Sequence, residues 1–304
     1  MTSAERLRAL LERPGILVMP GCHDAMSARL IEEAGFELGF MSGFAVSAAR
    51  LGMPDTGLIS YGEMVEQGQN ICRAVSIPMI SDGDTGFGSA QNIKRTVHGY
   101  ARAGFASIML EDQVAPKRCG HTEGKAVVGR DEALTRIRAA VDARDEGAGI
   151  LIMARTDARA CISLEEAIDR CRMFREIGAD ITFLEAPLNE AEMRRYCEEV
   201  DGPKMANLIE GGKTPNLPPR QLEALGYKIA VYPLTLLNVS IQAMRSALPS
   251  LARSERPSTA MDFEDLQKAV GFPEYYAEEA RYGGPAGASP AGPDHPTSVK
   301  PRSS

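Results

Sequence analysis

The stretch ILIMARTDARACISLEEAIDRCRMFREIGADITFLEAP, residues 150–187, holds one complete copy of the pattern that decides the fold. Two short apolar runs, Ile150–Arg155 and Ile181–Ala186, end in polar residues and flank a segment with helical spacing, Leu164–Ile177. Runs that are apolar on both faces are typical of strands buried in a parallel sheet. The stretch therefore predicts a strand, a helix and a second parallel strand.

Residues at the ends of the predicted helix support this interpretation. Ser163 precedes the helix and Glu166 follows three residues later, which predicts a capping box at its start. Gly178 follows its last residue, and glycine closes helices at low steric cost because it adopts the left-handed conformation easily.

The same alternation extends along most of the chain. Apolar runs lie at Ile16–Pro20, Leu38–Ser42, Ile77–Asp82, Ala106–Asp112, Ile150–Arg155, Ile181–Ala186, Lys204–Leu208 and Lys228–Tyr232. Eight strand–helix units in about 235 residues are the number and size of an α/β fold of the (β/α)8 barrel type. A doubly wound sheet is the alternative, but no glycine-rich phosphate turn follows the first run, and polar residues follow many runs instead of one switch point.

The pattern changes towards the carboxyl end. We expect residues 1–250 to form the catalytic barrel, and residues 251–282 to form a helical extension that makes an oligomer contact. Residues 283–304 are rich in glycine, proline, alanine and serine, and we expect a disordered tail there.

Composition excludes several other classes of protein. The 304 residues are 44% hydrophobic and 25% charged, which is ordinary for a globular chain. No apolar run approaches the roughly 18 residues of a membrane-spanning helix, and the amino terminus does not resemble a signal peptide. With 41 acidic residues against 34 Lys plus Arg, the net charge of −7 argues against nucleic-acid binding. The six cysteines form no Cys-x-x-Cys pair, so we expect reduced thiols and a cytoplasmic protein.

Acidic residues follow several of the predicted strands. Asp82 and Asp84 follow the third, Glu111 the fourth and Glu185 the sixth. The carboxyl ends of the strands meet at one rim of a barrel, where carboxylates that converge repel one another unless a cation lies among them. Oxygen ligands without a nearby histidine favour Mg²⁺, with Mn²⁺ as the alternative, so the sequence predicts a metal site.

A long polar loop after the fourth strand contains the second candidate feature. Cys119 follows Lys117 and Arg118 and precedes Gly120 and His121. Neighbouring cations lower the pKa of a thiol and favour the thiolate. We interpret Cys119 as a catalytic acid–base or nucleophile, and the loop from residue 114 to residue 125 as a lid.

Four motifs resemble the isocitrate lyase and phosphoenolpyruvate mutase superfamily. They are Asp-Gly-Asp-Thr-Gly-Phe-Gly at 82–88, Glu-Asp-Gln at 111–113, Lys-Arg-Cys-Gly-His at 117–121 and Ala-Arg-Thr-Asp at 154–157. The cysteine motif is typical of the branch that cleaves carbon–carbon bonds. The resemblance covers residues 14–248, and it implies a homotetramer, a dimer of dimers, whose C-terminal helices are exchanged between subunits.

By matched position, the resemblance implies a role for each site residue. Asp82, Asp84 and Glu111 would hold Mg²⁺. Substrate would contact Ser42, Gly43, Phe44, Asp55, Gly120, Arg155, Glu185 and Asn207. Lys117, Arg118 and His121 would stabilise negative charge, and Cys119 would protonate the carbanion. Phe40 replaces a tyrosine of related enzymes, so Glu111, Glu185 or a metal-bound hydroxide would act as the base.

The resemblance also bears on the substrate. Asn238 and, in a looser alignment, Glu264 replace arginines that pair with the third carboxylate of a tricarboxylate. Residues 206–215 and 183–187 resemble the group of 2,3-dimethylmalate lyase and petal death protein. We therefore expect a 2-hydroxydicarboxylate such as a 2-alkylmalate, cleaved to an α-keto acid and a saturated acid. The alternatives are 2-methylisocitrate lyase, oxaloacetate hydrolase or decarboxylase, carboxyphosphonoenolpyruvate mutase and a non-catalytic ligand-binding barrel.

Overall fold

The computed structural model describes residues 1–120 and 124–283, in which strands alternate with helices. The strands are β1 (Leu17–Cys22), β2 (Gly39–Met41), β3 (Met79–Asp82), β4 (Ser107–Glu111), β5 (Leu151–Thr156), β6 (Ile181–Leu184), β7 (Met205–Asn207) and β8 (Ile229–Tyr232). Each strand overlaps one of the predicted apolar runs.

The helices up to the end of the barrel follow the same alternation. They are α1 (Ser3–Glu12), α2 (Ala25–Glu33), α3 (Gly43–Leu51), α4 (Tyr61–Ala74), α5 (Ala90–Ala103), α6 (Arg130–Ala143), the short π-helix η1 (Arg144–Ala148), α7 (Ala158–Cys161), α8 (Leu164–Ile177), α9 (Glu190–Glu199), α10 (Pro219–Leu225) and α11 (Thr235–Ala252).

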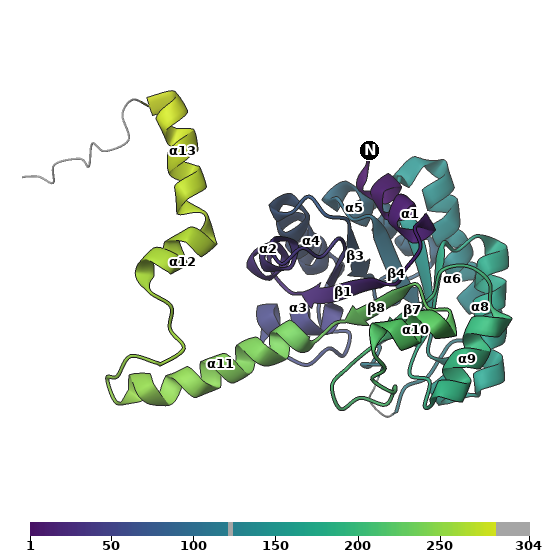
Figure 1. Cartoon of the computed structure of the whole chain (residues 1–304). Coiled ribbons are helices and arrows are strands. Elements are labelled where there is room, and N and C mark those ends of the chain that lie inside the picture. Colours follow the sequence, from purple (N-terminus) through teal and green to yellow (C-terminus); the bar gives the residue numbers. More distant parts are fainter. Residues whose placement is uncertain (121–123, 284–304) are drawn as a thin grey trace, which may run out of the picture. The chain divides into compact units, whose positions relative to one another are not determined.

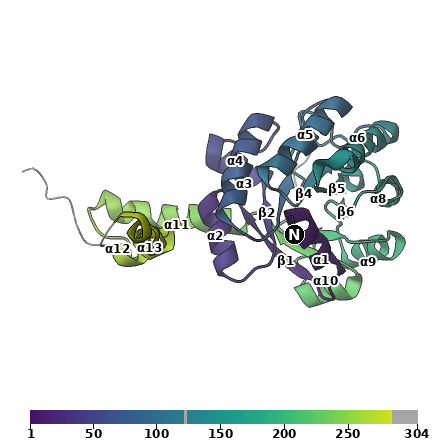
Figure 2. The same cartoon turned by 90° about the horizontal axis from the view of Figure 1, so that it is seen from above.

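The strands form a ring. They pair in parallel in the order β6-β5-β4-β3-β2-β1-β8-β7. A parallel bridge between Thr182 and Lys204 joins the two remaining edges, and the Thr182 N–H donates to the Pro203 carbonyl at 3.1 Å. Figures 1 and 2 show this ring with helices around its outside. The predicted (β/α)8 barrel is confirmed, and the doubly wound sheet is excluded because such a sheet leaves its two outer edges apart.

An apolar core fills the barrel and continues into α1. Alternate strand residues point inward, among them Met19, Ile80, Met109, Met153 and Ile181. They share one buried cluster with Leu7 and Leu10 of α1 and with Leu17, Leu151 and Ile229, which lie where strands begin. In both Figure 1 and Figure 2, α1 lies over one end of the ring of strands. This end is therefore closed by packed side chains.

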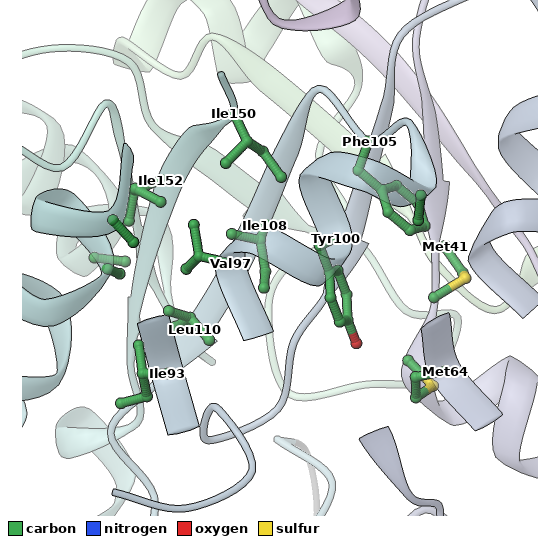
Figure 3. Close-up of a cluster of buried hydrophobic side chains, with 14 of the residues drawn as sticks. Met41, Met64, Ile93, Val97, Tyr100, Phe105, Ile108, Leu110, Ile150 and Ile152 are labelled. Atoms are coloured by element: carbon green, nitrogen blue, oxygen red, sulfur yellow. The ribbon is translucent and has the colours of Figure 1, made fainter. Parts of the chain in front are cut away.

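A second apolar layer lies between the strands and the outer helices (Figure 3). The strand residues of the opposite parity face it, so Ile108 of β4 and Ile152 of β5 belong to the same cluster as Ile93 and Val97 of α5. Burial of an aliphatic side chain of this size contributes about 1.5–3 kcal/mol. Tyr100 of α5 also belongs to this layer, and its hydroxyl donates to the Asp82 carbonyl at 3.2 Å. The layer thereby holds the end of β3.

The two ends of α8 differ in how closely they agree with the prediction from the sequence. Gly178 ends the helix in the left-handed conformation with φ of 111°, as predicted. Ser163 accepts a hydrogen bond from the Glu166 N–H at 3.2 Å, which is half of the predicted capping box. The Glu166 carboxylate pairs instead with Arg130 and Arg170. The reciprocal half is replaced because two guanidinium groups are stronger partners than one N–H.

The chain divides into two compact units, Met1–Met244 and Arg245–Ser304. The described part of the second unit contains the end of α11, then α12 (Phe263–Val270) and α13 (Phe272–Gly283). Within it the rings of Phe272 and Tyr276 lie 5.7 Å apart, while Phe263, Tyr275 and Tyr282 are exposed. The predicted tail lies outside the described residues except for its first residue. Among the described helices, none is long and apolar enough to cross a membrane.

Candidate active site

The alternation of strand side chains carries five polar residues into the barrel at the ends of their strands. Each lies two residues after an inward apolar residue: Asp82 after Ile80, Glu111 after Met109, Arg155 after Met153, Glu185 after Phe183 and Asn207 after Met205. All five residues are buried. In β4 and β5, Glu111 and Arg155 are direct register partners. The inward-facing positions of the strands are therefore apolar inside the barrel and polar or charged at its carboxyl-terminal rim.

A cavity opens at this rim. Most of the predicted site residues line it: Ser42, Phe44, Asp55, Asp82, Lys117, Arg118, Cys119, Gly120, Arg155, Glu185 and Asn207. Gly43, Asp84 and Glu111 do not line it, but they lie next to the lining residues Asp82, Lys117 and Arg155, respectively, and His121 lies outside the described residues. The structure thus brings together residues that are spread from position 42 to position 207.

Lys117 lies among buried carboxylates on one side of the cavity. Its Nζ is 2.7 Å from Asp55 Oδ2 and 2.7 Å from Asp84 Oδ1. Burial disfavours the charged ammonium, but Asp84, Asp82, Asp55 and Glu111 outweigh it and raise the pKa of Lys117 well above its usual value. Burial also raises the pKa of Asp84 to about 6, although Lys117 opposes the shift. The cluster holds more negative charge than one ammonium balances.

Arg155 is the cation on the other side. Its Nη1 lies 3.2 Å from Glu111 Oε2 and its Nη2 lies 3.2 Å from Glu185 Oε2. Burial opposes the charged guanidinium, yet Asp157, Glu111 and Glu185 together raise the pKa of Arg155 well above its usual value. Burial raises the pKa of Glu111, despite the opposing effect of Arg155. Asn207 Nδ2 lies 3.3 Å from both carboxylate oxygens of Glu185.

The segment Ser42–Phe44, which contains the cap and the first residues of α3, lies at a third side of the cavity. Ser42 caps the helix, and its hydroxyl accepts from the Ala45 N–H at 3.3 Å. A Cβ on Gly43 would lie 2.6 Å from Asp82 Oδ2, so only glycine allows the helix to begin this close to the carboxylate. Backbone N–H groups at a helix start suit a substrate carboxylate.

The loop after β4 brings the cysteine motif to the cavity. Gln113 holds Arg118 by two hydrogen bonds, from Nε2 to the Arg118 carbonyl at 2.8 Å and from the Arg118 N–H to Oε1 at 2.9 Å. Cys119 is half-buried, and Gly120 is buried. A Cβ on Gly120 would lie 2.5 Å from both Arg155 Nη2 and Glu185 Oε2. The glycine after the cysteine therefore lets the loop contact the charged rim.

The predicted metal residues suit a hard cation in their chemistry. Asp55 Oδ1 and both carboxylate oxygens of Glu111 are buried without a hydrogen bond, although Glu111 Oε2 forms an ion pair with Arg155. Among the described residues, however, no three His, Cys, Asp or Glu side chains are gathered as ligands of one ion. The reason is geometric: Lys117 takes Asp55 and Asp84 as ion-pair partners, and Asp82 Oδ1 accepts the Asp84 N–H at 2.9 Å. Carboxylate oxygens that accept no hydrogen bond can take Mg²⁺ or Mn²⁺ as a partner.

Sequence reasoning missed two parts of the site. Asp157 and Lys125 form a buried ion pair beside Arg155, with Lys125 Nζ 2.7 Å from Asp157 Oδ1. Asp157 is the last residue of the Ala-Arg-Thr-Asp motif at 154–157, but sequence reasoning assigned it no role, and nothing paired it with Lys125. The second part is an apolar wall of the cavity, formed by Phe40, Met109, Phe183, Met205, Ile209, Val231, Pro233 and Leu234.

A parallel barrel with this rim belongs to a class of enzymes whose active site lies at the carboxyl ends of the strands. The family model described as phosphoenolpyruvate phosphomutase matches residues 7–252. The chain is 42% identical over 286 residues to 2,3-dimethylmalate lyase of Eubacterium barkeri, covering 93% of this chain and 99% of that one. It is 40% identical over 281 residues to 2-methylisocitrate lyase of Aeropyrum pernix, covering 90% and 89%. The chain therefore belongs to the phosphoenolpyruvate mutase/isocitrate lyase superfamily, as its motifs predicted.

Solved structures agree with this assignment. A 2,3-dimethylmalate lyase described as a member of that superfamily superimposes with a TM-score of 0.89 and 36% identity, covering 93% of this chain and 96% of that one. A phosphonopyruvate hydrolase in complex with oxalate and Mg²⁺ superimposes with a TM-score of 0.82 and 27% identity, covering 93% and 99%. Because the relatives are enzymes, they support an enzymatic function for this chain.

Proposed function

We propose that the chain is a Mg²⁺-dependent lyase that cleaves a 2-hydroxydicarboxylate, such as a 2-alkylmalate, into an α-keto acid and a saturated carboxylic acid. The observation that carries the proposal is Arg155, which is buried between Glu111 and Glu185 against the Cys119–Gly120 segment. Carboxylate bases, a fixed cation and a thiol then surround one cavity. These are the groups that retro-aldol cleavage requires.

Mg²⁺ is the proposed cofactor, with Mn²⁺ as the alternative. Asp82, Asp84 and Glu111 would hold it, which agrees with the oxygen-only donor set and with the two buried carboxylate oxygens of Glu111 that accept no hydrogen bond. When bound, the ion supplies Lewis acidity that polarises the hydroxyl and carboxylate oxygens of the substrate. One solved relative, a phosphonopyruvate hydrolase, is a complex with oxalate and Mg²⁺.

The chain's own residues bind the substrate and remove a proton from it. The backbone of Ser42–Phe44 and the amide of Asn207 would contact the carboxylate of the 2-hydroxy acid, because N–H groups at a helix start and a side-chain amide are suitable hydrogen-bond donors. Glu185 lines the cavity and Glu111 pairs with the lining residue Arg155, so these two carboxylates are the candidates for the base that takes the hydroxyl proton. Phe40 occupies the wall without a titratable group.

Cleavage breaks the bond between the carbon that carries the hydroxyl and its neighbour. The hydroxyl oxygen becomes the keto oxygen, and the electron pair of the broken bond passes to the other fragment as an enolate-like carboxylate. Lys117, Arg118 and Arg155 would stabilise its charge. Cys119 would then deliver a proton to the carbanion carbon, which leaves a saturated acid. His121 lies outside the described residues, and the charge-stabilising role that its motif implies remains part of the proposal.

The cavity wall supports the choice of substrate. Phe40, Met109, Phe183 and Leu234 offer an apolar surface to an alkyl substituent. A third carboxylate would need a cationic partner when buried. We therefore favour a 2-alkylmalate, in line with 42% identity to a 2,3-dimethylmalate lyase. Cleavage of 2-methylisocitrate is the second candidate, because a 2-methylisocitrate lyase is 40% identical.

The test is a screen for keto-acid release with Mg²⁺ present. The substrates are malate, several 2-alkylmalates, isocitrate, 2-methylisocitrate and oxaloacetate, each also measured with a chelator and with Cys119→Ser. We expect a 2-alkylmalate to be cleaved fastest and the chelator to abolish the reaction. Faster cleavage of 2-methylisocitrate would replace the substrate assignment, and the absence of keto acid from every substrate would overturn the proposed function.

We also propose that the described helices of the second unit contact another copy of this chain, in a homotetramer. The exposed aromatic side chains of Phe263, Tyr275 and Tyr282 support this proposal, because aromatic residues are enriched at interfaces. Light scattering after size-exclusion chromatography would give a tetramer for the wild type. It would give a smaller species for the double variant Phe263→Glu/Tyr275→Glu. A wild-type monomer would contradict the proposal.

A further inference from the structure

A buried carboxylate lies directly behind Arg155. Asp157 is fully buried, and its carboxylate accepts hydrogen bonds from Arg155 Nε at 2.8 Å and from Arg155 Nη2 at 3.1 Å. This two-point contact fixes the plane of the guanidinium. The same guanidinium lies 3.2 Å from Glu111 and 3.2 Å from Glu185. The orientation of Arg155 towards both acids is thus set by Asp157.

Lys125 connects this carboxylate to the cysteine motif. Its side chain is 2% exposed, and its Nζ donates to Asp157 Oδ1 at 2.7 Å and to the Gly120 carbonyl. Gly120 in turn contacts the groups at the rim, since a Cβ there would lie 2.5 Å from Arg155 Nη2. One ammonium therefore links the backbone beside Cys119 to the carboxylate that orients Arg155.

Asp157 itself is held by a second layer of interactions. Its N–H donates to Asp112 Oδ1 at 2.9 Å, and the Thr156 hydroxyl donates to Asp112 Oδ2 at 2.6 Å. Arg170 Nη1 donates to the same oxygen at 2.8 Å, and both partners are buried. This network makes the end of β5 a rigid support, because buried polar groups with satisfied partners have few alternative arrangements.

We propose that Lys125 and Asp157 are positioning residues that fix the Cys119–Gly120 backbone relative to the Arg155 guanidinium. Neither residue lines the cavity, so each acts through the group it contacts. The effect on turnover rests on the proposed function, whereas the effect on the position of Cys119 does not. A displacement of about 1 Å at a catalytic group can cost about a hundredfold in rate.

The test compares Lys125→Met with Lys204→Met. Lys204 is a matched control, because it is also buried and also donates to a backbone carbonyl, that of Gly202 at 2.8 Å, at the start of β7. The readout that needs no substrate is the rate at which iodoacetamide alkylates Cys119, measured on its peptide by mass spectrometry. A half-buried thiol reacts when its surroundings open, so we expect Lys125→Met to raise this rate about tenfold and Lys204→Met to leave it near the wild-type rate.

The kinetic readout separates positioning from a structural role. We expect Lys125→Met to lower kcat about ten- to a hundredfold with a smaller change in KM, whereas Lys125→Arg recovers part of the rate. Asp157→Asn would show the same alkylation change, and it replaces Lys125→Met if that variant does not fold. An alkylation rate equal to that of Lys204→Met would overturn the proposal. If Lys125→Met speeds alkylation but the wild-type protein cleaves no substrate, the result would support positioning and contradict the proposed function.

Discussion

The two ends of the barrel are built by the same strands but have opposite chemistry. Where the strands begin, the inward side chains are apolar and pack with Leu7 and Leu10 of α1. Where they finish, the inward positions hold Asp82, Arg155 and Glu185, and a cavity replaces the packed core. The first end buries apolar surface and the second concentrates charge, so we expect mutations to affect stability at the first and chemistry at the second.

The largest expected effect removes the thiol at the charged end. We expect Cys119→Ser to slow carbon–carbon cleavage by about 10²- to 10⁴-fold, because a serine hydroxyl is a far weaker acid than a thiol. Its melting temperature would stay near that of the wild type, because a half-buried Cys→Ser change alters little packing. Steady-state kinetics and a thermal melt measure the two effects. Cys197→Ser on α9 is the control, and equal loss of activity in both variants would contradict a specific role for Cys119.

The next prediction sharpens the comparison, because a buried ion pair behind the charged rim also contributes to stability. Arg170→Met leaves Asp112 buried without its ion-pair partner, although the Thr156 hydroxyl still donates to it. We expect a loss of about 3–5 kcal/mol in the free energy of unfolding. Urea denaturation measures it. A loss below about 1 kcal/mol would show that the buried pair contributes little.

The third prediction addresses the apolar end. Leu7 of α1 is fully buried, and Leu7→Ala removes part of the cluster that closes the barrel. We expect a loss of about 2–4 kcal/mol in the free energy of unfolding, with kcat within about twofold of the wild type. Urea denaturation and initial rates measure both quantities. A fall in kcat much larger than twofold would contradict the separation of a stabilising end from a catalytic end.

The smallest effect is expected away from both ends. Lys94 and Glu146 form a partly exposed ion pair on the outer layer. We expect Lys94→Ala to change the free energy of unfolding by less than about 1 kcal/mol, because solvent screens such pairs. The same urea experiment measures this change. A larger loss would show that the Lys94–Glu146 pair contributes to stability, contrary to the comparison of the two ends.

The sequence could predict most of the fold because strand and helix periods are local. The segment Leu164–Ile177 coincides with α8, and every predicted apolar run contains strand residues. Ring closure rests on a bridge between Thr182 and Lys204, which no local pattern shows. The barrel was therefore predicted from the number of units and from the spread of polar residues over many strand ends.

The site was less accessible to sequence reasoning. Sequence motifs and the positions of strand ends identify Cys119 and Arg155 as site residues, and both line one cavity. Asp157 and Lys125 were missed because their contact joins the end of β5 to the loop after β4, and a lone lysine in a polar loop usually faces solvent. The apolar wall was missed because its residues have the same composition as core residues.

The measurement that tests the central claim most directly is cleavage of 2,3-dimethylmalate in D₂O with Mg²⁺, followed by NMR of both products. Breaking the bond between the two central carbons gives pyruvate and propionate, and an exchangeable thiol such as that of Cys119 would deliver deuterium to the new C–H bond. We predict equimolar products with a single deuterium at C2 of propionate, in one configuration because a fixed donor delivers it to one face. Label of mixed configuration, or pyruvate release by Cys119→Ser at the wild-type rate, would contradict protonation by Cys119.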